Sequence, residues 1–432
     1  MAQTSELKIA IIGAGPAGLT LASLLTASPH PFNFTVFELR QRPHPSEVNL
    51  PCGNLDLQEG LGLQALQACG LYPQFLEIES DCTQQSKVLN KNGTVLFDHV
   101  TQKQPEISRN ALTQLLLSSV PVDRIRWNTK VLAVIPADHS SGQGTVVSQE
   151  TIALNSTSET FDLIVGADGA WSRARAAIPS TPQPIYSGVC YITLFLPRLT
   201  EKYPELDQLI GGGTFAVCED EKLLLAQRTV GGTARVCFFL HSKCQPAVKR
   251  ALQSSGHDDR IGPSPILDAN SLPLTLPTRP EELQKFLLTN YDFFASWSDE
   301  IKHLLTVTLN EQPADAEIVA YPMHMLPLTP YPHTHMRGIV LVGDAAHLMT
   351  PFAGKGVNIA MADSLSLAEQ LEYLAVGRSS TMSLYDALDE AIVGYEEVAH
   401  PRAEKAMNLT WHNLLLSYGG NGPEQIGNVL ES

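Results

Sequence analysis

The N-terminal part of the chain alternates apolar runs with glycine-rich breaks, and this pattern predicts strands joined to helices. An apolar run at 7–12 leads directly into Gly13-Ala14-Gly15-Pro16-Ala17-Gly18, and a second apolar stretch follows at 19–25. The first run has the length of a buried strand, and the second predicts a helix that ends before the prolines at 29 and 31. Another short apolar run, at 34–37, predicts the next strand and ends at Glu38.

The same arrangement returns nearer the C-terminus. An apolar run at 338–342 predicts a buried strand, and the loop after it contains Gly354 and Gly356. Beyond the loop, apolar residues recur at helical spacing, at Val357, Ala360, Met361, Leu365, Ala368 and Leu371. The chain therefore contains two predicted strand–turn–helix units with glycine in the turn, far apart in sequence.

Between these two units the pattern changes twice. A small layer of strands is predicted at 124–135 and 145–154, and a buried strand runs from 161 into Ala167-Asp168-Gly169. After the prolines at 179–184, loosely alternating runs predict a β-sheet without glycine-rich turns, at 187–196, 214–218, 222–227 and 233–240. Further helices are predicted at 171–177, 283–294, 299–308 and 385–411, the last with an exposed face carrying Arg402, Glu404 and Lys405.

Composition narrows the class of protein. The chain has 432 residues, 44% of them apolar and 17% charged, which fits a globular protein of two or three domains. A net charge of −16 argues against nucleic acid or an anionic membrane surface as a partner. Seven cysteines, none in CxxC spacing, argue against a disulfide framework or a zinc site. We expect a soluble, cytoplasmic protein with no metal, no signal peptide and no membrane span.

The first glycine-rich turn has the full context of a dinucleotide-binding motif. It follows a strand, has GxGxxG spacing, opens a helix, and is followed by a second strand whose last residue is the acid Glu38. Gly13 permits the tight turn, Gly15 lets a pyrophosphate approach, and Gly18 lets the helix pack on the strand. Glu38 is placed to hold ribose hydroxyls. These residues predict a site for NAD or FAD, the alternative being a turn without a ligand.

The second glycine-rich turn carries different chemistry. Asp344, at the carboxyl end of a predicted strand, can accept hydrogen bonds from the hydroxyls of a ligand. The loop Gly354-Lys355-Gly356 lets backbone N–H groups approach a flat polar ring, with a helix N-terminus behind them. An ordinary strand–turn–helix without a ligand is the alternative.

The whole string 343–358 resembles the second flavin-contacting motif of the class A flavoprotein monooxygenases, the FAD-dependent aromatic hydroxylases with the para-hydroxybenzoate hydroxylase fold. Four other segments resemble the same family in the same order: 13–18 with Glu38, 50–57, 105–112 and 162–173. The segment at 50–57 is most similar to the tetracycline-inactivating branch.

The resemblance implies an α/β fold with a Rossmann-like FAD-binding domain, a β-sheet substrate domain over the flavin, and a C-terminal bridging helix. The FAD-binding domain is expected to be discontinuous, formed by 1–68, 102–180 and 318–395. The substrate domain is then expected at 69–101 and 181–317, and the bridging helix at 396–432.

The resemblance also implies a set of FAD-binding residues. They are Gly13, Ala14, Gly15, Pro16, Ala17, Gly18, Glu38, Asp56, Arg109, Asp168, Asp344, Gly354, Lys355, Gly356, Val357 and Asn358. Two of these keep alternatives open. Asp168 either caps the helix that follows it or supports FAD and the pyridine nucleotide. Lys355 stands in place of the family's usual Gln, and it either stabilises an anionic reduced flavin or points to solvent, which is our expectation.

The reaction that the resemblance implies belongs largely to the cofactor. NAD(P)H reduces FAD, O₂ adds to give a flavin C4a-(hydro)peroxide, and this oxygen passes to an aromatic ring, enol or alkene by hydroxylation or epoxidation. By analogy the substrate is a polycyclic natural product of secondary metabolism, and the protein a monomer or weak dimer. The alternatives are a halogenase, a redox-neutral cyclase or another FAD-dependent oxidoreductase, of which the halogenase lacks its WxWxIP string here.

No side chain is assigned a catalytic role. His347, beside Asp344, is a candidate base, but we interpret it as a structural member of its motif; His324, His333 and His335 have no metal-ligand spacing.

Substrate choice is expected to lie in 181–317. A rough alignment there sets Thr193 and Val236 where the tetracycline-inactivating enzymes use Gln and His on their substrate. Tetracycline is therefore not expected as the substrate.

Overall fold

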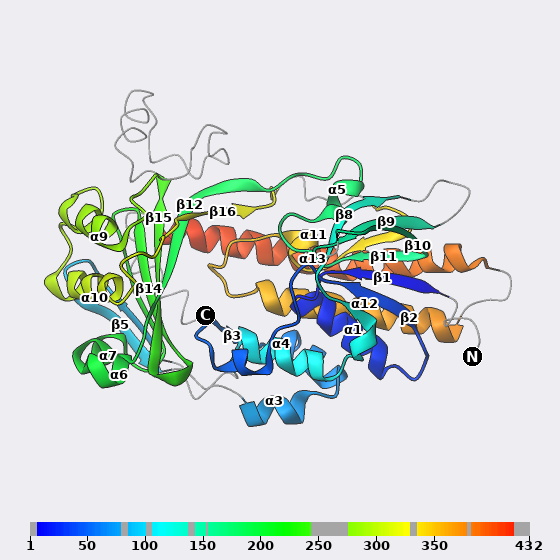
Figure 1. Cartoon of the computed structure of the whole chain (residues 1–432), viewed down its shortest axis with the longest axis horizontal. Helices are drawn as coiled ribbons and strands as arrows, with labels where there is room; N and C mark the ends of the chain where they lie inside the picture. Colours follow the sequence, from blue (N-terminus) through cyan, green and yellow to red (C-terminus); the bar gives the residue numbers. More distant parts are fainter. Residues whose placement is uncertain are drawn as a thin grey trace.

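The computed structural model contains two main β-sheets, with a long C-terminal helix that runs along both (Figure 1). It describes residues 7–78, 85–100, 106–136, 143–152, 154–242, 275–328, 335–377 and 382–418. Pro105, His333 and most of the polar loop at 138–144 lie outside these ranges. In the part of the chain that the structure describes, no helix has the length and apolar character needed to cross a membrane.

The first sheet is parallel and has the order β17-β11-β1-β2-β7. Its strands are β1 (Lys8–Ile12), β2 (Asn33–Phe37), β7 (Ile125–Arg126), β11 (Leu163–Gly166) and β17 (Ile339–Leu341).

Both faces of this sheet are covered. In β1, Ile9 and Ile11 pack into one apolar cluster with the helices α1 (Pro16–Ala27) and α12 (Gly356–Gly377), whereas Ala10 and Ile12 pack into another on the opposite face. Burial on both faces explains why the strands read as unbroken apolar runs rather than as alternating ones.

Smaller elements surround the parallel sheet. The antiparallel sheet on its second face is formed by β8 (Thr129–Ile135), β9 (Gly144–Glu150) and β10 (Ser156–Phe161). A two-stranded sheet pairs β3 (Asn54–Asp56) with β6 (Glu106–Ser108). The remaining elements are α2 (Gly62–Ala68), α3 (Tyr72–Ile78), α4 (Arg109–Ser118), α5 (Arg173–Ala177), α11 (Asp344–His347), η1 (Pro45–Asn49) and η2 (Val122–Arg124).

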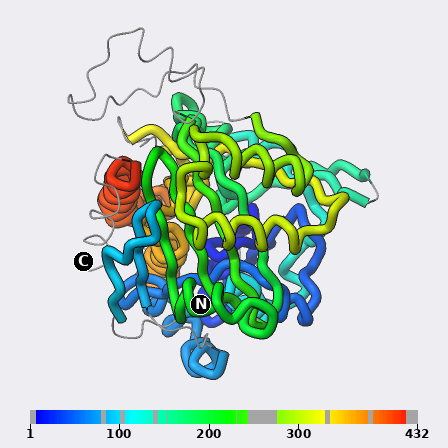
Figure 2. Tube along the Cα trace, turned by 90° about the vertical axis from the view of Figure 1, so that its left-hand side faces the viewer, coloured from blue at the N-terminus to red at the C-terminus, as the bar shows by residue number. Residues whose placement is uncertain are grey.

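The second sheet is mostly antiparallel and has the order β16-β12-β15-β14-β13-β4-β5. Its strands are β4 (Gln85–Leu89), β5 (Val95–Val100), β12 (Ile185–Leu196), β13 (Thr214–Glu219), β14 (Lys222–Thr229), β15 (Thr233–His241) and β16 (Tyr321–Met325), and the other elements of this region are α6 (Leu199–Lys202), α7 (Pro204–Ile210) and η3 (Val230–Gly232). Helices α9 (Pro280–Thr289) and α10 (Asp299–Asn310) cover one of its faces, as Figure 2 shows with the yellow-green helices in front of the green strands.

Helix α9 is shorter than the predicted helix at 283–294. The Asn290 side chain accepts a hydrogen bond from the backbone N–H of Asp292 at 2.9 Å, and this local turn competes with continued helix. The chain leaves the helix at Thr289 for this reason.

The two faces of the second sheet carry different side chains, and this corrects the expectation that Thr193 and Val236 lie together in the substrate pocket. Leu194 and Val236 pair across β12 and β15, and both are buried in the cluster beneath α9 and α10. Thr193 and Cys237 pair in the next register position and project from the opposite face. Because side chains alternate along a strand, Val236 cannot share a pocket face with Thr193, and its predicted place in the substrate pocket is wrong.

The C-terminal helix α13 (Leu384–Ser417) connects the two sheets. Leu388 and Ile392 pack in the core of the parallel sheet, and Leu414 packs with residues of the seven-stranded sheet such as Phe239. The helix begins one residue before the predicted start at 385, where Ser383 caps it by accepting a hydrogen bond from the N–H of Asp386, and so it extends on both sides of the expected domain boundary at 396. Residues 419–432 lie outside the described part.

Two segments pack on the other side of their expected domain boundaries. Leu71 and Phe75, around α3, are buried in the core of the parallel sheet. Strand β16 pairs with β12 in the seven-stranded sheet. The domain bounds stay a prediction, and these contacts favour placing 69–78 with the first unit and 321–325 with the second.

Candidate active site

The first glycine-rich turn is packed so closely that two of its residues have no room for a side chain. Gly13 has φ +105°, and an added Cβ would lie 2.4 Å from the carbonyl oxygen of Ala167. A Cβ on Gly18 would lie 2.0 Å from the carbonyl oxygen of Gly13. Gly15 differs, because no atom lies within 4 Å of the place a Cβ would take. Two glycines therefore close the turn, and the third leaves open space at the N-terminus of α1.

Glu38 ties this turn to the end of β2. Its carboxylate accepts hydrogen bonds from the N–H of Ala14 at 2.7 Å, and from the backbone N–H and the Nε of Arg40, each at 2.9 Å. Burial alone raises the pKa of Glu38, but the bonds to Arg40 and Ala14 outweigh it and lower the pKa. Glu38 is therefore held ionised beside the turn, and its contact with a ribose stays a prediction.

Asp168 caps the helix that follows it. Its carboxylate accepts hydrogen bonds from the Ser172 hydroxyl and from the N–H of Arg173, both at 2.5 Å. Of the two roles left open by the sequence, the structure confirms capping. A further contact of Asp168 with FAD stays a prediction.

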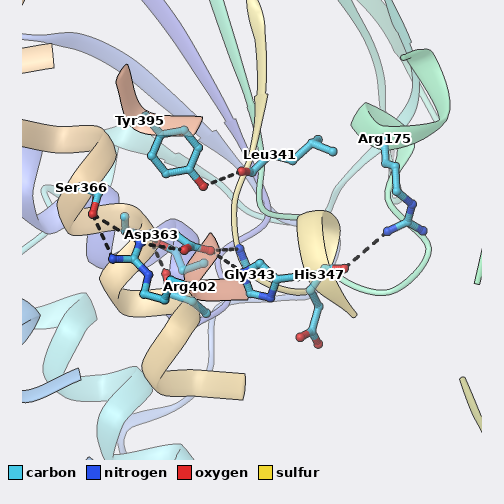
Figure 3. Close-up of polar contacts among 12 residues, drawn as sticks. Arg175, Leu341, Gly343, His347, Asp363, Ser366, Tyr395 and Arg402 are labelled. Carbon is cyan, nitrogen blue, oxygen red and sulfur yellow. Dashed lines mark hydrogen bonds and ion pairs between the residues drawn. The ribbon is translucent and has the colours of Figure 1, made fainter. Parts of the chain in front are cut away.

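The turn that carries Asp344 is fixed from one side by a buried charged network (Figure 3). Gly343, with φ +62°, donates its N–H to the Asp363 carboxylate at 3.0 Å. The same carboxylate bonds Nε2 of His347 at 2.5 Å and accepts from Nη2 of Arg402, on α13, at 3.0 Å. His347 and Asp363 are almost fully buried. Their ion pair therefore holds the turn in place.

The pKa of His347 is raised and that of Asp363 is lowered, as expected for an ion pair between them. Burial disfavours both charged forms, but the charge of Asp363 and its hydrogen bond raise the pKa of His347. His347 and Arg402 in turn lower the pKa of Asp363. His347 is therefore a charged structural residue turned toward Asp363, as we interpreted it. Arg402 is not exposed as expected; its guanidinium reaches Asp363 and Ser366.

A second set of contacts fixes the turn from the other side. Arg175, a buried residue of α5, donates from Nη1 to the carbonyl oxygen of Ala345 at 2.9 Å, and from Nη2 to that of Ala170. The hydroxyl of Tyr395 donates to the carbonyl oxygen of Leu341 at 2.8 Å (Figure 3). Arg175 therefore joins the segment after β11 to the segment after β17, and Tyr395 joins α13 to β17 itself. Asp344 is therefore carried by a turn with little freedom.

The loop at 354–356 is cross-linked to the segment at 50–58. The Asn358 side chain donates to the carbonyl oxygen of Asp56 and accepts from the N–H of Gln58, both at 2.8 Å. Lys355 donates to the side-chain oxygen of Gln58 at 2.7 Å. Lys355 is therefore half-exposed with its ammonium tied to Gln58, and both of its predicted roles, toward the flavin or toward solvent, stay predictions. Sequence reasoning missed Gln58, since nothing in its own segment marks it.

Both glycines of this loop face open space. Gly354 has φ +61°, and neither Gly354 nor Gly356 has an atom within 4 Å of the place a Cβ would take. Val357, at the start of α12, packs against the core of the parallel sheet. The loop therefore offers bare backbone on one side while its other side is anchored.

Asp344 and Arg109 face a hollow between the two sheets. Both keep exposed side chains, yet burial is the largest influence on the pKa of each, raising that of Asp344 and lowering that of Arg109. Solvent therefore reaches both side chains although dense protein surrounds them, and we call the space beside them the hollow. The charges of Arg235, Asp344, Cys52 and Tyr191 also act on Arg109. The hollow therefore joins three predicted cofactor segments to the seven-stranded sheet.

Comparison with known proteins identifies the family. The FAD binding domain model matches residues 6–210 and 302–410. Monooxygenase penA of Penicillium thymicola is 88% identical over 432 residues, all of both chains, and monooxygenase asqM of Emericella nidulans is 56% identical over the full length of both. The chain belongs to the FAD-dependent monooxygenases of this family. The fold and the cofactor predicted from the sequence are thereby confirmed.

A solved structure supports the fold of this monooxygenase independently. Klebsiella pneumoniae HpxO complexed with FAD and uric acid matches with a TM-score of 0.68 and 18% identity, covering 99% of this chain and 94% of that one. At this identity the likeness concerns the fold alone. The relatives do not support the halogenase or cyclase alternatives.

Proposed function

We propose that this monooxygenase uses NAD(P)H and O₂ to hydroxylate or epoxidise an aromatic, enolic or alkene-containing small molecule, with a polycyclic natural product as the substrate class. Reduced FAD supplies the oxygen activation. The observation that carries the proposal is that Arg109, from a predicted cofactor segment, and Arg235, from the seven-stranded sheet, both lie beside Gly53.

The open glycine positions support FAD as the group that binds here. We propose that Gly13 to Gly18 receive the pyrophosphate, where Gly15 leaves bare backbone at the N-terminus of a helix. Glu38 holds the adenosine ribose, and Asp344 accepts from hydroxyls of the ribityl chain. Gly354, Lys355, Gly356, Val357 and Asn358 border the flavin ring, with Asp56 and Arg109 beside it.

The seven-stranded sheet supplies the substrate side. The face that projects Thr193 and Cys237 also carries a contiguous aromatic wall, in which Tyr191 lies 6.2 Å from Phe239 and Phe239 lies 5.7 Å from Phe352, measured between ring centroids. Phe352 belongs to the segment before the 354–356 loop. Flat aromatic side chains of this kind favour a flat apolar substrate and exclude water from the ring being oxygenated.

Mass spectrometry tests the proposal. The FAD-loaded enzyme is incubated with NADPH or NADH and a panel of polycyclic aromatic, enolic and alkene compounds under ¹⁸O₂. We expect one labelled oxygen atom in a product and consumption of the nicotinamide coupled to that product. Oxidation of a panel compound without label from O₂ would contradict oxygen transfer and favour a dehydrogenase.

A further inference from the structure

Arg235 projects from the seven-stranded sheet toward the flavin side. It alternates with Val236, which is buried beneath α9 and α10, so Arg235 shares the opposite face with Cys237 and Phe239. A Cβ on Gly53 would lie 2.9 Å from its Nη1 and 3.8 Å from the Nε of Arg109. The two guanidinium groups therefore both lie beside Gly53, Arg109 from α4 and Arg235 from β15.

Among the described residues no acid forms an ion pair with either guanidinium, although the charge of Asp344 acts on Arg109. Within the described ranges, no side-chain hydrogen bond or ion pair of either guanidinium is found. Arginine keeps its charge in proteins, and two like charges in a partly desolvated space repel each other. The charge of Arg235 accordingly contributes to lowering the pKa of Arg109. Such a pair is stabilised when an anion enters the space between the two groups.

We propose that Arg109 and Arg235 form an anion-binding subsite, and that Arg235 selects substrates with an acidic oxygen, a carboxylate or an ionised phenol or enol, attached to an aromatic system. This rests on the proposed function and adds the charge of the substrate to it. The aromatic wall explains why the anion belongs to the substrate. Phe239, which lies on the same strand and face as Arg235, is buried, whereas Tyr191, its partner on β12, is half-buried. A substrate ring that rests against Tyr191 would present its acidic group toward Arg235.

Two matched ligand pairs test the subsite. Benzoate and 2-naphthoate are compared with benzamide and 2-naphthamide, which have nearly the same shape but no charge. Calorimetry gives the dissociation constants for the FAD-loaded wild type, Arg235→Gln, Arg235→Lys and Lys130→Gln. The last variant removes one positive charge from an exposed position on β8, away from the hollow.

The expected result is a preference of about tenfold or more for the carboxylates in the wild type and in Lys130→Gln. Arg235→Gln should lose most of this preference by weakening carboxylate binding alone, and Arg235→Lys should keep part of it. FAD content and unfolding temperature should stay at the wild-type level in all variants.

Three results would overturn the proposal. They are failure of both carboxylates to bind, an equal preference in wild type and Arg235→Gln, and loss of FAD from Arg235→Gln, which would assign the arginine to the flavin. Failure of the proposed function is distinguishable, because it would appear as absent ¹⁸O transfer in an enzyme whose carboxylate preference is intact.

Discussion

The two sheets present their candidate functional groups in different ways. The parallel sheet does so from its strand ends, where Gly13, Glu38, Asp168 and Asp344 follow β1, β2, β11 and β17. The seven-stranded sheet does so from the middle of its strands, through alternate side chains such as Thr193 and Arg235. If the pairing of a strand is predicted wrongly by one residue, every side chain of that strand is assigned to the wrong face of the sheet. A group in the turn after a strand is still assigned to the correct end of the sheet. Positions at strand ends are therefore specified more firmly by the sequence than positions within strands.

The largest effect is expected where the parallel sheet is fixed to α13. Asp363→Ala removes the acid between His347 and Arg402 and leaves a buried imidazolium without its partner. Breaking a buried pair in this way costs about 3–5 kcal/mol of unfolding free energy. Denaturant unfolding with and without FAD measures the loss, and Glu390→Ala, at an exposed position of α13, is the control. A loss below about 1 kcal/mol would mean that the network does not hold the Asp344 turn.

The two faces of the seven-stranded sheet should respond differently to polar substitutions. Val236→His places an imidazole in the buried cluster beneath α9 and α10, where an unpaired polar group costs about 1–3 kcal/mol. Thr193→Gln, on the other face, should change unfolding free energy by about 0.5 kcal/mol or less and alter ligand binding instead. Thermal unfolding and calorimetry with 2-naphthoate separate the two effects. Equal destabilisation by both variants would contradict the assignment of the faces.

The difference between groups at strand ends and groups within strands also explains which parts of the site could be predicted from the sequence. The turn at 13–18 was predicted from its own segment, because glycine spacing and an acid after a strand are visible there. The segment at 343–358 was predicted as a loop leading into a helix, and the short helix α11 within it was not predicted. Val236 was placed on the wrong face because nothing in an irregularly alternating strand fixes its register, and the outer face is covered by helices distant in sequence. Asp363, Gln58 and Arg235 were missed for a related reason, since their partners lie in other segments.

The affinity for FAD should depend on pH through Asp344. Burial raises the pKa of its carboxyl above the ordinary range, although His347, Arg109 and Arg175 act in the opposite direction. If the ionised carboxylate of Asp344 accepts hydrogen bonds from FAD hydroxyls, then at a pH below this pKa the carboxyl must lose its proton when FAD binds. The dissociation constant should then rise about tenfold for each pH unit below the pKa and be constant above it. Asp344→Asn should flatten the profile, and an unchanged slope in this variant would assign the titration to another group.

A smaller effect is expected for His347. His347→Asn keeps a donor for Asp363 but removes the charge, so the protein should lose stability. Turnover of the FAD-loaded enzyme should stay within a few-fold of the parent, because the imidazole faces Asp363 and not the hollow. Stopped-flow oxidation at matched FAD content measures this. A decrease of about 10²-fold or more, the size expected for a general acid or base, would contradict the structural role.

The central claim, that the ends of the parallel strands hold FAD in the hollow, is tested most directly by counting bound flavin. The purified wild type and Asp344→Ala are titrated with FAD after removal of any bound flavin, and the released cofactor is identified by chromatography. We expect a yellow wild type that binds one FAD, and not FMN, per chain, and an Asp344→Ala variant that remains folded but binds FAD at least about tenfold more weakly. A colourless wild type that takes up no FAD, or a folded Asp344→Ala with the affinity of the parent, would contradict it.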